Sequence, residues 1–322
     1  MISRSRLADR RMLTLFATAM SIAAPAAHAQ GATPQRAVLV TGASSGIGRR
    51  ITERLASSGF FVYAGARSQK DIDDLNKIRN VQAVRLDVTV ASDIVAAVTT
   101  VTNAGRGLYG VVNNAGVVTV TPMLEATDQD LEFLFNVNLY GPIRITRAFG
   151  PLLLASKGRV VNISSLNGIV TSPMIVPYSM SKHAMEAYGD GLAAELSRLG
   201  VRVSLIEPGN YGTEIGKNML ARMDTSIVKG SRFEGQMRAA IASLGAFESN
   251  PPPDDVAAAV YDAFTSDNPR MRYLVVPAAN QAALTFRKLM DDIVQLNEGQ
   301  KFSYDRDALV KMLDDAIARA KR

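Results

Sequence analysis

Four polar residues in the middle of the chain have the types and order needed to move a proton to and from an oxygen atom. Tyr178 and Lys182 lie four residues apart, so a helix would place them on one face. An ammonium beside a phenol favours the phenolate, and we expect Lys182 to lower the pKa of Tyr178 from its usual value of about 10. Ser165, thirteen residues before Tyr178, could stabilise charge on the same substrate oxygen. Asn138 precedes them in a segment of helical pattern.

Each of these residues also has a purely structural interpretation. A tyrosine and a lysine at this spacing are common in helices, and Asn138 could be a hydrogen-bonded polar residue beside a helix kink. Ser164 and Ser165 could both cap a loop, and the spacing to Tyr178 favours Ser165 as the reactive serine.

Short runs of Val, Ile and Leu alternate with amphipathic segments after residue 36. Strands buried on both faces have such continuous apolar runs, and strands that alternate with helices predict a doubly wound parallel sheet. We therefore predict an α/β fold of the Rossmann type in one domain, 36–277, with helices on both faces and a ligand at the carboxyl ends of the strands. The predicted strands are 36–40, 60–65, 81–86, 110–113, 158–164, 201–208 and 272–277. The predicted helices are 46–58, 92–103, 128–154 and 177–198.

A glycine-rich loop follows the first predicted strand, in the stretch TGASSGIG. Its glycines allow a tight turn and a close backbone approach to a pyrophosphate, which would bind at the N-terminus of the next helix. The spacing is GxxxGxG rather than GxGxxG, and a tight turn without a ligand is the alternative. The position between a strand and a helix favours a nucleotide-binding loop. The predicted contacts are Thr41, Gly42, Ser44, Ser45, Gly46, Ile47 and Gly48.

The end of the second predicted strand indicates which dinucleotide would bind. NAD sites place a carboxylate here to bind the ribose 2′-hydroxyl, but residues 55–70 contain no Asp or Glu. Arg67 lies at this position and could pair with a 2′-phosphate. We predict NADP(H) rather than NAD(H); the alternative is that Arg67 is a solvated turn residue.

Taken together, these motifs resemble those of the single-domain branch of the short-chain dehydrogenase/reductase family. The loop TGASSGIG, the NNAG stretch at 113–116 and the PGxxxT pattern at 208–213 occur in the family's order and spacing. The resemblance implies a catalytic tetrad of Asn138, Ser165, Tyr178 and Lys182. It also implies that Tyr178 and Lys182 contact the cofactor, and that Asn138 supports a chain of water molecules. The further cofactor contacts that it implies are Asp87, Val88, Asn114, Ala115, Gly116, Pro208, Gly209 and Thr213.

The resemblance also implies the reaction. We expect an oxidoreductase that transfers a hydride between NADP(H) and a small-molecule carbonyl or alcohol, in a homodimer or homotetramer that pairs through the helices starting at Asp128 and Pro177. The stretch VSLIEPGNYGTEI is similar to hydroxysteroid and retinol dehydrogenases. Two alternatives are an NADP-binding sensor without catalysis and an epimerase or dehydratase of the extended branch. An intact tetrad favours the enzyme over the sensor, and the glycine spacing argues against the extended branch.

The residues that would surround the substrate are apolar. Residues 211–248 lack a strand pattern, and the resemblance implies that they form a lid. Flexible methionines suit an adaptable pocket, although helix packing alone gives a similar stripe. The residues concerned are Met219, Leu220, Met223, Phe233 and Met237, together with Leu166, Val170, Met174 and Val176 before them. Residues 278–322 have apolar and charged residues at helical spacing and predict a helical extension.

Composition excludes several classes of function. The formal net charge of the 322 residues is +6. Residues 1–29 contribute about half of it, and the remainder is too small to indicate nucleic-acid binding. The chain has no cysteine and two histidines, which argues against a disulfide framework and a cysteine or histidine metal site.

The first 29 residues have the order of an export signal. Arginines are followed by an apolar run rich in Ala, Leu, Met and Thr, and then by Ala27, His28 and Ala29. The apolar run is too short to span a bilayer. Arg10 and Arg11 resemble a twin-arginine signal, which exports folded proteins, so the enzyme would reach the periplasm with its cofactor bound. The alternative is a misassigned start codon in a cytoplasmic enzyme.

Overall fold

The computed structural model describes residues 35–221 and 228–320. Its centre is a sheet of seven parallel strands in the order β3-β2-β1-β4-β5-β6-β7. The fold is therefore the Rossmann-type α/β sheet that the alternating pattern predicts. The strands are β1 (Ala37–Val40), β2 (Phe61–Ala66), β3 (Val81–Arg85), β4 (Gly110–Asn113), β5 (Arg159–Ile163), β6 (Arg202–Pro208) and β7 (Arg272–Val275).

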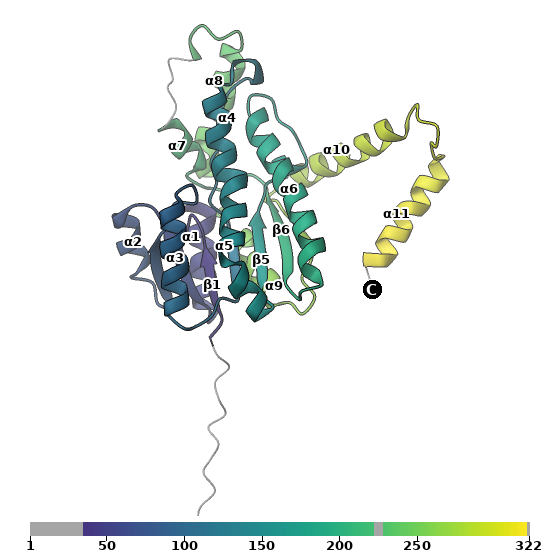
Figure 1. Cartoon of the computed structure of the whole chain (residues 1–322). Helices are drawn as coiled ribbons and strands as arrows, with labels where there is room; N and C mark the ends of the chain where they lie inside the picture. Colours follow the sequence, from purple (N-terminus) through teal and green to yellow (C-terminus); the bar gives the residue numbers. More distant parts are fainter. Residues whose placement is uncertain (1–34, 222–227, 321–322) are drawn as a thin grey trace, which may run out of the picture. The chain divides into compact units, whose positions relative to one another are not determined.

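Helices cover both faces of the sheet, and a hydrophobic core lies on each side. On one face, Ile51 and Leu55 of α1 pack with Val260 and Phe264 of α9 against the strands. On the other face, α3, α5 and α6 bury residues such as Phe149, and Figure 1 shows these three helices in front of the sheet. The helices are α1 (Gly46–Ser57), α2 (Gln69–Leu75), α3 (Ala91–Asn103), α4 (Asp128–Phe135), α5 (Gly141–Ser156), α6 (Val176–Ser197) and α9 (Asp254–Thr265).

The predicted helix over residues 128–154 is interrupted by a π-helical turn, η2 (Asn136–Tyr140). The capping box of Thr127 and Asp130 starts α4, and the helical pattern continues through η2 into α5. A π-helical turn inside a helix frequently marks a functional site. Here it carries Asn138, one of the four candidate catalytic residues.

Shorter elements border the carboxyl ends of the strands. The 3₁₀ turns are η1 (Met123–Glu125), η3 (Leu166–Gly168) and η5 (Ala246–Ser249). The predicted lid contains α7 (Ile215–Leu220) and α8 (Glu234–Gly245). The predicted helical extension contains α10 (Ala279–Asn297) and α11 (Arg306–Ala320). None of the helices in the described residues is long and apolar enough to cross a membrane.

The sheet has its topological switch point between β1 and β4. The chain leaves β1 towards β2 and β3 and then returns to place β4 on the other side of β1. Ligands of doubly wound sheets bind in the crevice outside the strand ends at such a point. The glycine-rich loop after β1 and Asn114 after β4 therefore meet there.

Candidate active site

The glycine-rich loop has backbone conformations and contacts that require glycine. Gly42 and Gly46 have φ angles of +63° and +52°, in the left-handed region. A Cβ atom on Gly48 would lie 2.1 Å from the carbonyl oxygen of Gly42 and 2.4 Å from Nδ2 of Asn114. The loop therefore folds tightly back onto the first turn of α1.

The start of α1 offers a site for an anion. Ser45 precedes the helix without a side-chain hydrogen bond to it, and the first turn carries no acidic residue. The first N–H groups of a helix lack partners within the helix and carry partial positive charge. Ser44, Gly46 and Gly48 line the same cleft. These donors and the close backbone approach fit the pyrophosphate of a dinucleotide.

Replacing Gly48 by alanine should strongly destabilise this half of the protein. The added Cβ would overlap backbone atoms of Gly42, and overpacking typically costs about 1–3 kcal/mol even where side chains can move aside. We expect Gly48→Ala to lower the free energy of unfolding in urea by at least about 3 kcal/mol. Gly235→Ala is the matched control, because a Cβ on this exposed glycine of α8 would meet nothing within 4 Å. Equal stability of the two variants would contradict the packing described here.

Asn114 and Thr41 hold the loop against the end of β4. Nδ2 of Asn114 donates hydrogen bonds to the carbonyl oxygens of Thr41 and Gly42, at 2.9 and 3.0 Å. Oγ1 of Thr41 accepts hydrogen bonds from the backbone N–H groups of Asn114 and Ala115, both at 3.0 Å. Thr41 is buried and does not line the cleft, so its contribution is to fix the loop.

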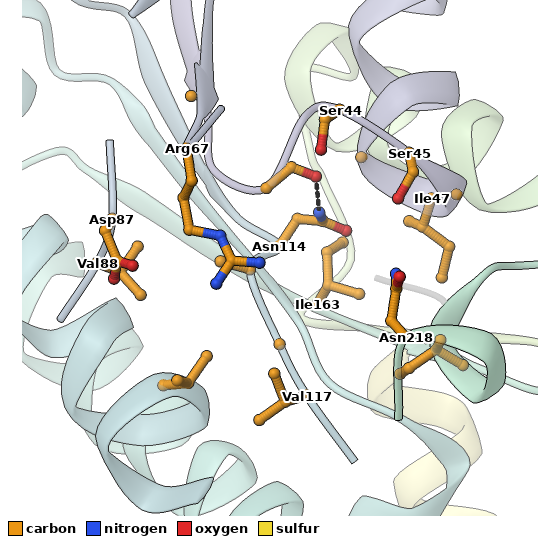
Figure 2. A pocket seen from close by; sticks show the side chains of 18 of the residues that line it. Ser44, Ser45, Ile47, Arg67, Asp87, Val88, Asn114, Val117, Ile163 and Asn218 are labelled. Atoms are coloured by element: carbon orange, nitrogen blue, oxygen red, sulfur yellow. Dashed lines mark hydrogen bonds between the residues drawn. The ribbon is translucent and has the colours of Figure 1, made fainter. Parts of the chain in front are cut away.

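The cleft runs along the carboxyl ends of β1, β2, β4 and β5. The structure places most of the predicted cofactor-binding residues on its wall, and Figure 2 shows several of them. Pro208 and Gly209 do not line it; Gly209 packs against Val276 and Gln281 instead. The predicted residues on the wall are Gly42, Ser44, Ser45, Gly46, Ile47, Gly48, Arg67, Asp87, Val88, Asn114, Ala115, Gly116, Tyr178, Lys182 and Thr213. Residues on the wall that the sequence analysis missed include Thr89, Val117, Ile163, Ile215 and Asn218.

Arg67 extends its guanidinium into the cleft (Figure 2). Within the described residues, no hydrogen bond or ion pair engages this guanidinium, while the backbone oxygen of Arg67 accepts a hydrogen bond from Arg85. Asp87 is held locally, because its Oδ1 accepts hydrogen bonds from the N–H and the hydroxyl of Thr89. A free guanidinium at the end of β2 can bind a phosphate group.

Tyr178 and Lys182 lie one turn apart in α6. Lys182 is buried, and its Nζ donates a hydrogen bond of 2.9 Å to the carbonyl oxygen of Ile163. Its Nζ lies 5.7 Å from the centre of the Tyr178 ring. Burial disfavours the ammonium and lowers the pKa of Lys182 to about 8, while the charge of Glu186 opposes this shift.

The expected lowering of the Tyr178 pKa is wrong for this structure. Burial raises the pKa of Tyr178, because the phenolate loses hydration, and a hydrogen bond with Ser165 lowers it only in part. The Lys182 ammonium is directed to the Ile163 carbonyl, which explains why it does not reverse the effect of burial.

Ser165, rather than Ser164, is the serine that contacts Tyr178. Ser165 lies at the start of η3, and its Oγ also accepts a hydrogen bond of 3.1 Å from the N–H of Asn167. Ser164 is turned towards Gly168, on which a Cβ would lie 2.8 Å from the Ser164 hydroxyl. The contact with Tyr178 favours Ser165 as the sequence spacing does, whereas Ser164 is the serine that lines the cleft.

Asn138 connects η2 to the loop after β4 and to α6. Its Oδ1 accepts a hydrogen bond of 2.8 Å from the N–H of Val117, and its Nδ2 donates to the oxygen of Val117 at 2.9 Å and to Ser181 at 3.0 Å. A Cβ on Gly116 would lie 3.5 Å from Oδ1 of Asn138 and 3.8 Å from Nζ of Lys182. Tyr178 and Lys182 therefore line one end of the cleft, and Ser165 and Asn138 lie buried behind them, next to Tyr178 and to Gly116 and Ser181 respectively.

An apolar cluster lies beside Tyr178. Val118, Val120 and Met219 are buried in it, and α7 and α8 supply further side chains. Glu125 of η1 holds the segment just before α8 in place, because its carboxylate accepts hydrogen bonds from the Ser231 hydroxyl and from the N–H of Arg232. The other members are Met174, Ile175, Tyr178, Ile215, Leu220, Ala240 and Ile241. Of the other predicted lid residues, Met237 is buried, Phe233 is half-buried, and Met223 lies outside the described residues.

The stability of the protein should depend on the titration of Lys182. Its native pKa of about 8 lies below the value of 10.5 of an exposed lysine, so the unfolded chain binds more protons between these pH values. Stability therefore rises with pH across this window. Relative to Lys182→Met, we expect the wild-type free energy of unfolding to increase by on the order of 3 kcal/mol from pH 8 to pH 10.5. Urea unfolding of both proteins at several pH values measures this; parallel curves would contradict the burial of a charged Lys182.

Metal chemistry has no candidate site in this region. The described residues contain no group of three or more His, Cys, Asp or Glu side chains that could hold a metal ion.

Comparisons with known proteins agree with this geometry. A family model described as short chain dehydrogenase matches residues 36–224. Mouse mitochondrial D-beta-hydroxybutyrate dehydrogenase is 37% identical over 187 residues, which are 55% of this chain and 54% of that protein. The chain thus matches about half the length of that relative. An NADPH-dependent 3-dehydrocapnine reductase from Ornithobacterium rhinotracheale is 33% identical over 253 residues, which are 75% of this chain and 88% of that protein.

A solved structure shows the same fold over most of the chain. The crystal structure of a short-chain dehydrogenase from Streptomyces avermitilis has a TM-score of 0.70 and 29% sequence identity, and the match covers 83% of this chain and 96% of that one. The order of the strands, the cleft at the switch point and the family match lead to one conclusion: this chain belongs to the short-chain dehydrogenase/reductase family of oxidoreductases.

Proposed function

We propose that the protein is an NADP(H)-dependent oxidoreductase that interconverts an apolar carbonyl compound and its alcohol. The observation that carries the proposal is that Tyr178 and Lys182 line one end of a cleft whose other residues fit a dinucleotide, with Ser165 and Asn138 buried beside them. The relative from Ornithobacterium rhinotracheale is an NADPH-dependent reductase, which supports NADPH as the cofactor and reduction as the reaction.

The cofactor would lie along the cleft that the glycine-rich loop opens. The first turn of α1 would hold the pyrophosphate, and Arg67 would pair with the 2′-phosphate of the adenine ribose. Lys182 would bind the nicotinamide ribose. When bound, the cofactor supplies or accepts the hydride.

Protein residues handle the proton and the developing charge. Tyr178 donates its hydroxyl proton to the substrate oxygen during reduction, and Ser165 donates a hydrogen bond to that oxygen. Because burial raises the pKa of Tyr178, the hydroxyl keeps its proton until charge develops on the substrate. Lys182, with its ammonium in the same buried region, then favours the phenolate. Asn138 holds the loop at Val117 and the Ser181 turn of α6 in place by hydrogen bonds. A chain of water molecules beside Asn138 would return a proton to Tyr178.

The substrate class follows from the side chains beside Tyr178. Val118, Val120 and Met219 form a buried apolar cluster against which Tyr178 packs, and Ile163 and Ile215 line the cleft. Met174 in the same cluster can adapt to different shapes. A ketone or aldehyde with an apolar substituent fits this environment better than a charged hydroxy acid.

The experiment is a spectrophotometric assay of the chain lacking residues 1–29. NADPH and NADH oxidation are followed with a panel of apolar ketones and aldehydes, and with charged keto acids for comparison. The proposal expects turnover with NADPH and at least one apolar carbonyl compound, and weaker turnover with the keto acids. Tight NADPH binding without oxidation by any carbonyl compound would favour the sensor that the sequence leaves as an alternative.

The assembly and the location of the protein form part of the same proposal. We expect a homodimer or homotetramer in which α5 and α6 pair with their counterparts, because an apolar groove lined by Gly150, Leu154 and Leu192 lies between them.

Residues 1–29 lie outside the described residues, and we expect them to direct periplasmic export of the folded protein. Lysine replacement of Arg10 and Arg11 should then retain the protein in the cytoplasm, which cell fractionation measures; unchanged delivery would exclude the twin-arginine route.

A further inference from the structure

Two acidic side chains are buried where α6 packs against β6, and the proposed reaction uses neither of them. Glu186 lies in α6, one turn after Lys182, and is 7% exposed. Glu207 lies in β6 and is 1% exposed. An ionised carboxylate loses its hydration when it is buried, so each of these groups needs a partner or a proton. Both contact Arg272 at the start of β7.

Arg272 cannot neutralise both buried carboxylates. Its Nη1 donates hydrogen bonds to Oε2 of Glu186 and to Oε1 of Glu207, the second at 3.0 Å. Its Nη2 donates to both carboxylate oxygens of Asp190 at 2.7 Å. One positive charge therefore serves three carboxylates, and the two buried ones converge on a single nitrogen atom. Two buried like charges at such a separation do not both ionise readily, and one of them keeps a proton.

Glu207 is the member of the pair that holds the proton. Burial and the negative charge of Glu186 raise the pKa of Glu207 to about 7, although the hydrogen bond with Arg272 opposes this shift. Glu186 and Glu207 also lie within hydrogen-bonding reach of each other. Protonated Glu207 can therefore donate a hydrogen bond to Glu186, which remains the carboxylate.

The second oxygen of Glu186 lies in the same buried region as the Lys182 ammonium. Among the described residues, no hydrogen-bond partner engages Oε1 of Glu186. A Cβ on Gly168 would lie 2.8 Å from this oxygen and 2.8 Å from Oγ of Ser164, which lines the cleft. Ser164 directly follows Ile163, whose carbonyl oxygen accepts the hydrogen bond of Lys182. Burial lowers the pKa of Lys182 to about 8, and the charge of Glu186 opposes a further fall.

We propose that Glu186 and Glu207 hold one proton between them and that this acid pair keeps Lys182 in its ammonium form, which makes Glu186 a positioning residue for the lysine of the candidate active site. As the pH rises, Glu207 releases its proton before Lys182 does. The added negative charge then helps Lys182 to retain its own proton. The ammonium that favours the Tyr178 phenolate therefore persists to a higher pH than it would beside an uncharged side chain.

Few other charged groups act on the pair. The titratable side chains that contact it or influence it are Lys182 and Asp190 of α6 and Arg272 of β7. The turn η3, which packs against α6, has the sequence Leu-Asn-Gly and adds no titratable side chain. The ionisation of Glu207 is therefore the nearest change of charge that Lys182 experiences at neutral pH.

Carbon-13 NMR of the full chain measures the two ionisations without any assay of turnover. Protein labelled at Cε of lysine and Cδ of glutamate is titrated from about pH 5 to about pH 10. Loss of a signal in Lys182→Met or in Glu207→Gln assigns it. We expect Glu186→Gln to lower the midpoints of both Lys182 and Glu207 by about one pH unit, because the same negative charge is removed from beside both groups. Unchanged midpoints in this variant would overturn the proposal.

Asp190→Asn is the matched control. It also removes a carboxylate from Arg272, but this side chain is 56% exposed and lies two turns from Lys182, so water screens its charge. We expect it to change neither midpoint, and equal shifts in Glu186→Gln and Asp190→Asn would contradict a specific role of Glu186. Should Glu186→Gln not fold, the wild type decides: the Lys182 signal should show a first step at the Glu207 midpoint near pH 7. Absence of that step would overturn the coupling.

The consequence for turnover rests on the proposed function. In the wild type, we expect kcat for carbonyl reduction to fall at alkaline pH as Lys182 loses its proton, and we expect Glu186→Gln to move this alkaline limit about one pH unit lower. Asp190→Asn should keep the wild-type limit. An alkaline limit that stays in place while the Lys182 midpoint moves would overturn the role in turnover. A wild type that reduces no carbonyl compound would refute the proposed function instead, and the NMR midpoints would still decide whether the acid pair acts on Lys182.

Discussion

Replacing Tyr178 by phenylalanine should reduce carbonyl turnover by about 10²- to 10⁴-fold, the range that a positioned general acid contributes. The variant removes only the hydroxyl that the structure places beside Ser165 in a buried environment. The ring, its packing against the apolar cluster and the cofactor cleft remain. We therefore expect the dissociation constant for NADPH, measured by fluorescence titration, to be unchanged while kcat falls.

The matched control is Tyr188→Phe. Tyr188 lies in the same helix, ten residues further along, and lines the groove between α5 and α6 rather than the cofactor cleft. Its variant also loses one phenolic hydroxyl but should retain turnover. Normal turnover by Tyr178→Phe, or equal losses in the two variants, would show that another residue supplies the proton.

Replacing Arg67 by alanine should weaken NADPH binding by about ten- to a hundredfold and leave NADH binding unchanged. Hydrogen bonds to charged groups contribute about 1.5–3 kcal/mol, and about 1.4 kcal/mol corresponds to a tenfold change in affinity. The Arg67 guanidinium projects into the cleft and is not engaged by other described residues, so its loss breaks no internal contact. The measurement is the ratio of the two dissociation constants in the wild type and the variant.

Arg106→Ala is the control for the loss of a positive charge. Arg106 stacks on Phe61 away from the cleft, 4.3 Å from the ring centre, and its replacement changes the net charge by the same amount. If the Arg67 variant weakens NADPH and NADH binding equally, Arg67 contributes general attraction rather than recognition of the 2′-phosphate. If it weakens neither, another group selects the cofactor.

The sheet was predictable because its strands are buried on both faces. A continuous apolar run such as AVLV of β1 is stable only when both faces of the strand are buried. All seven predicted strands occur within two residues of their expected limits. The π-helical turn at Asn138 was not predictable, because the apolar pattern continues through it. It depends on hydrogen bonds between Asn138 and Val117, which lie 21 residues apart.

The parts of the candidate site that were predictable are those whose residue types and spacing indicate a specific chemical role. The glycine-rich loop, Asn114, Tyr178 and Lys182 meet as the motifs indicate. Apolar residues of the cleft, such as Ile163 and Ile215, were missed because their sequence context is that of ordinary core.

The direction of the Tyr178 pKa was wrong for a related reason. A spacing of four residues gives the proximity of Lys182, but it shows neither the depth of burial nor the hydrogen bond from Lys182 to the backbone of Ile163. Burial and this hydrogen bond both depend on distant segments that meet only in the folded chain.

The most direct test of the central claim is to follow the hydride. NADPH carrying deuterium at both positions of nicotinamide C4 is incubated with the protein and an apolar ketone that supports turnover, and the product is analysed by mass spectrometry and NMR. Direct transfer predicts one deuterium on the carbinol carbon of the alcohol, and at least about a hundredfold less of this alcohol when Tyr178→Phe replaces the wild type. An alcohol without deuterium, or NADPH consumption without alcohol formation, would contradict carbonyl reduction at this site.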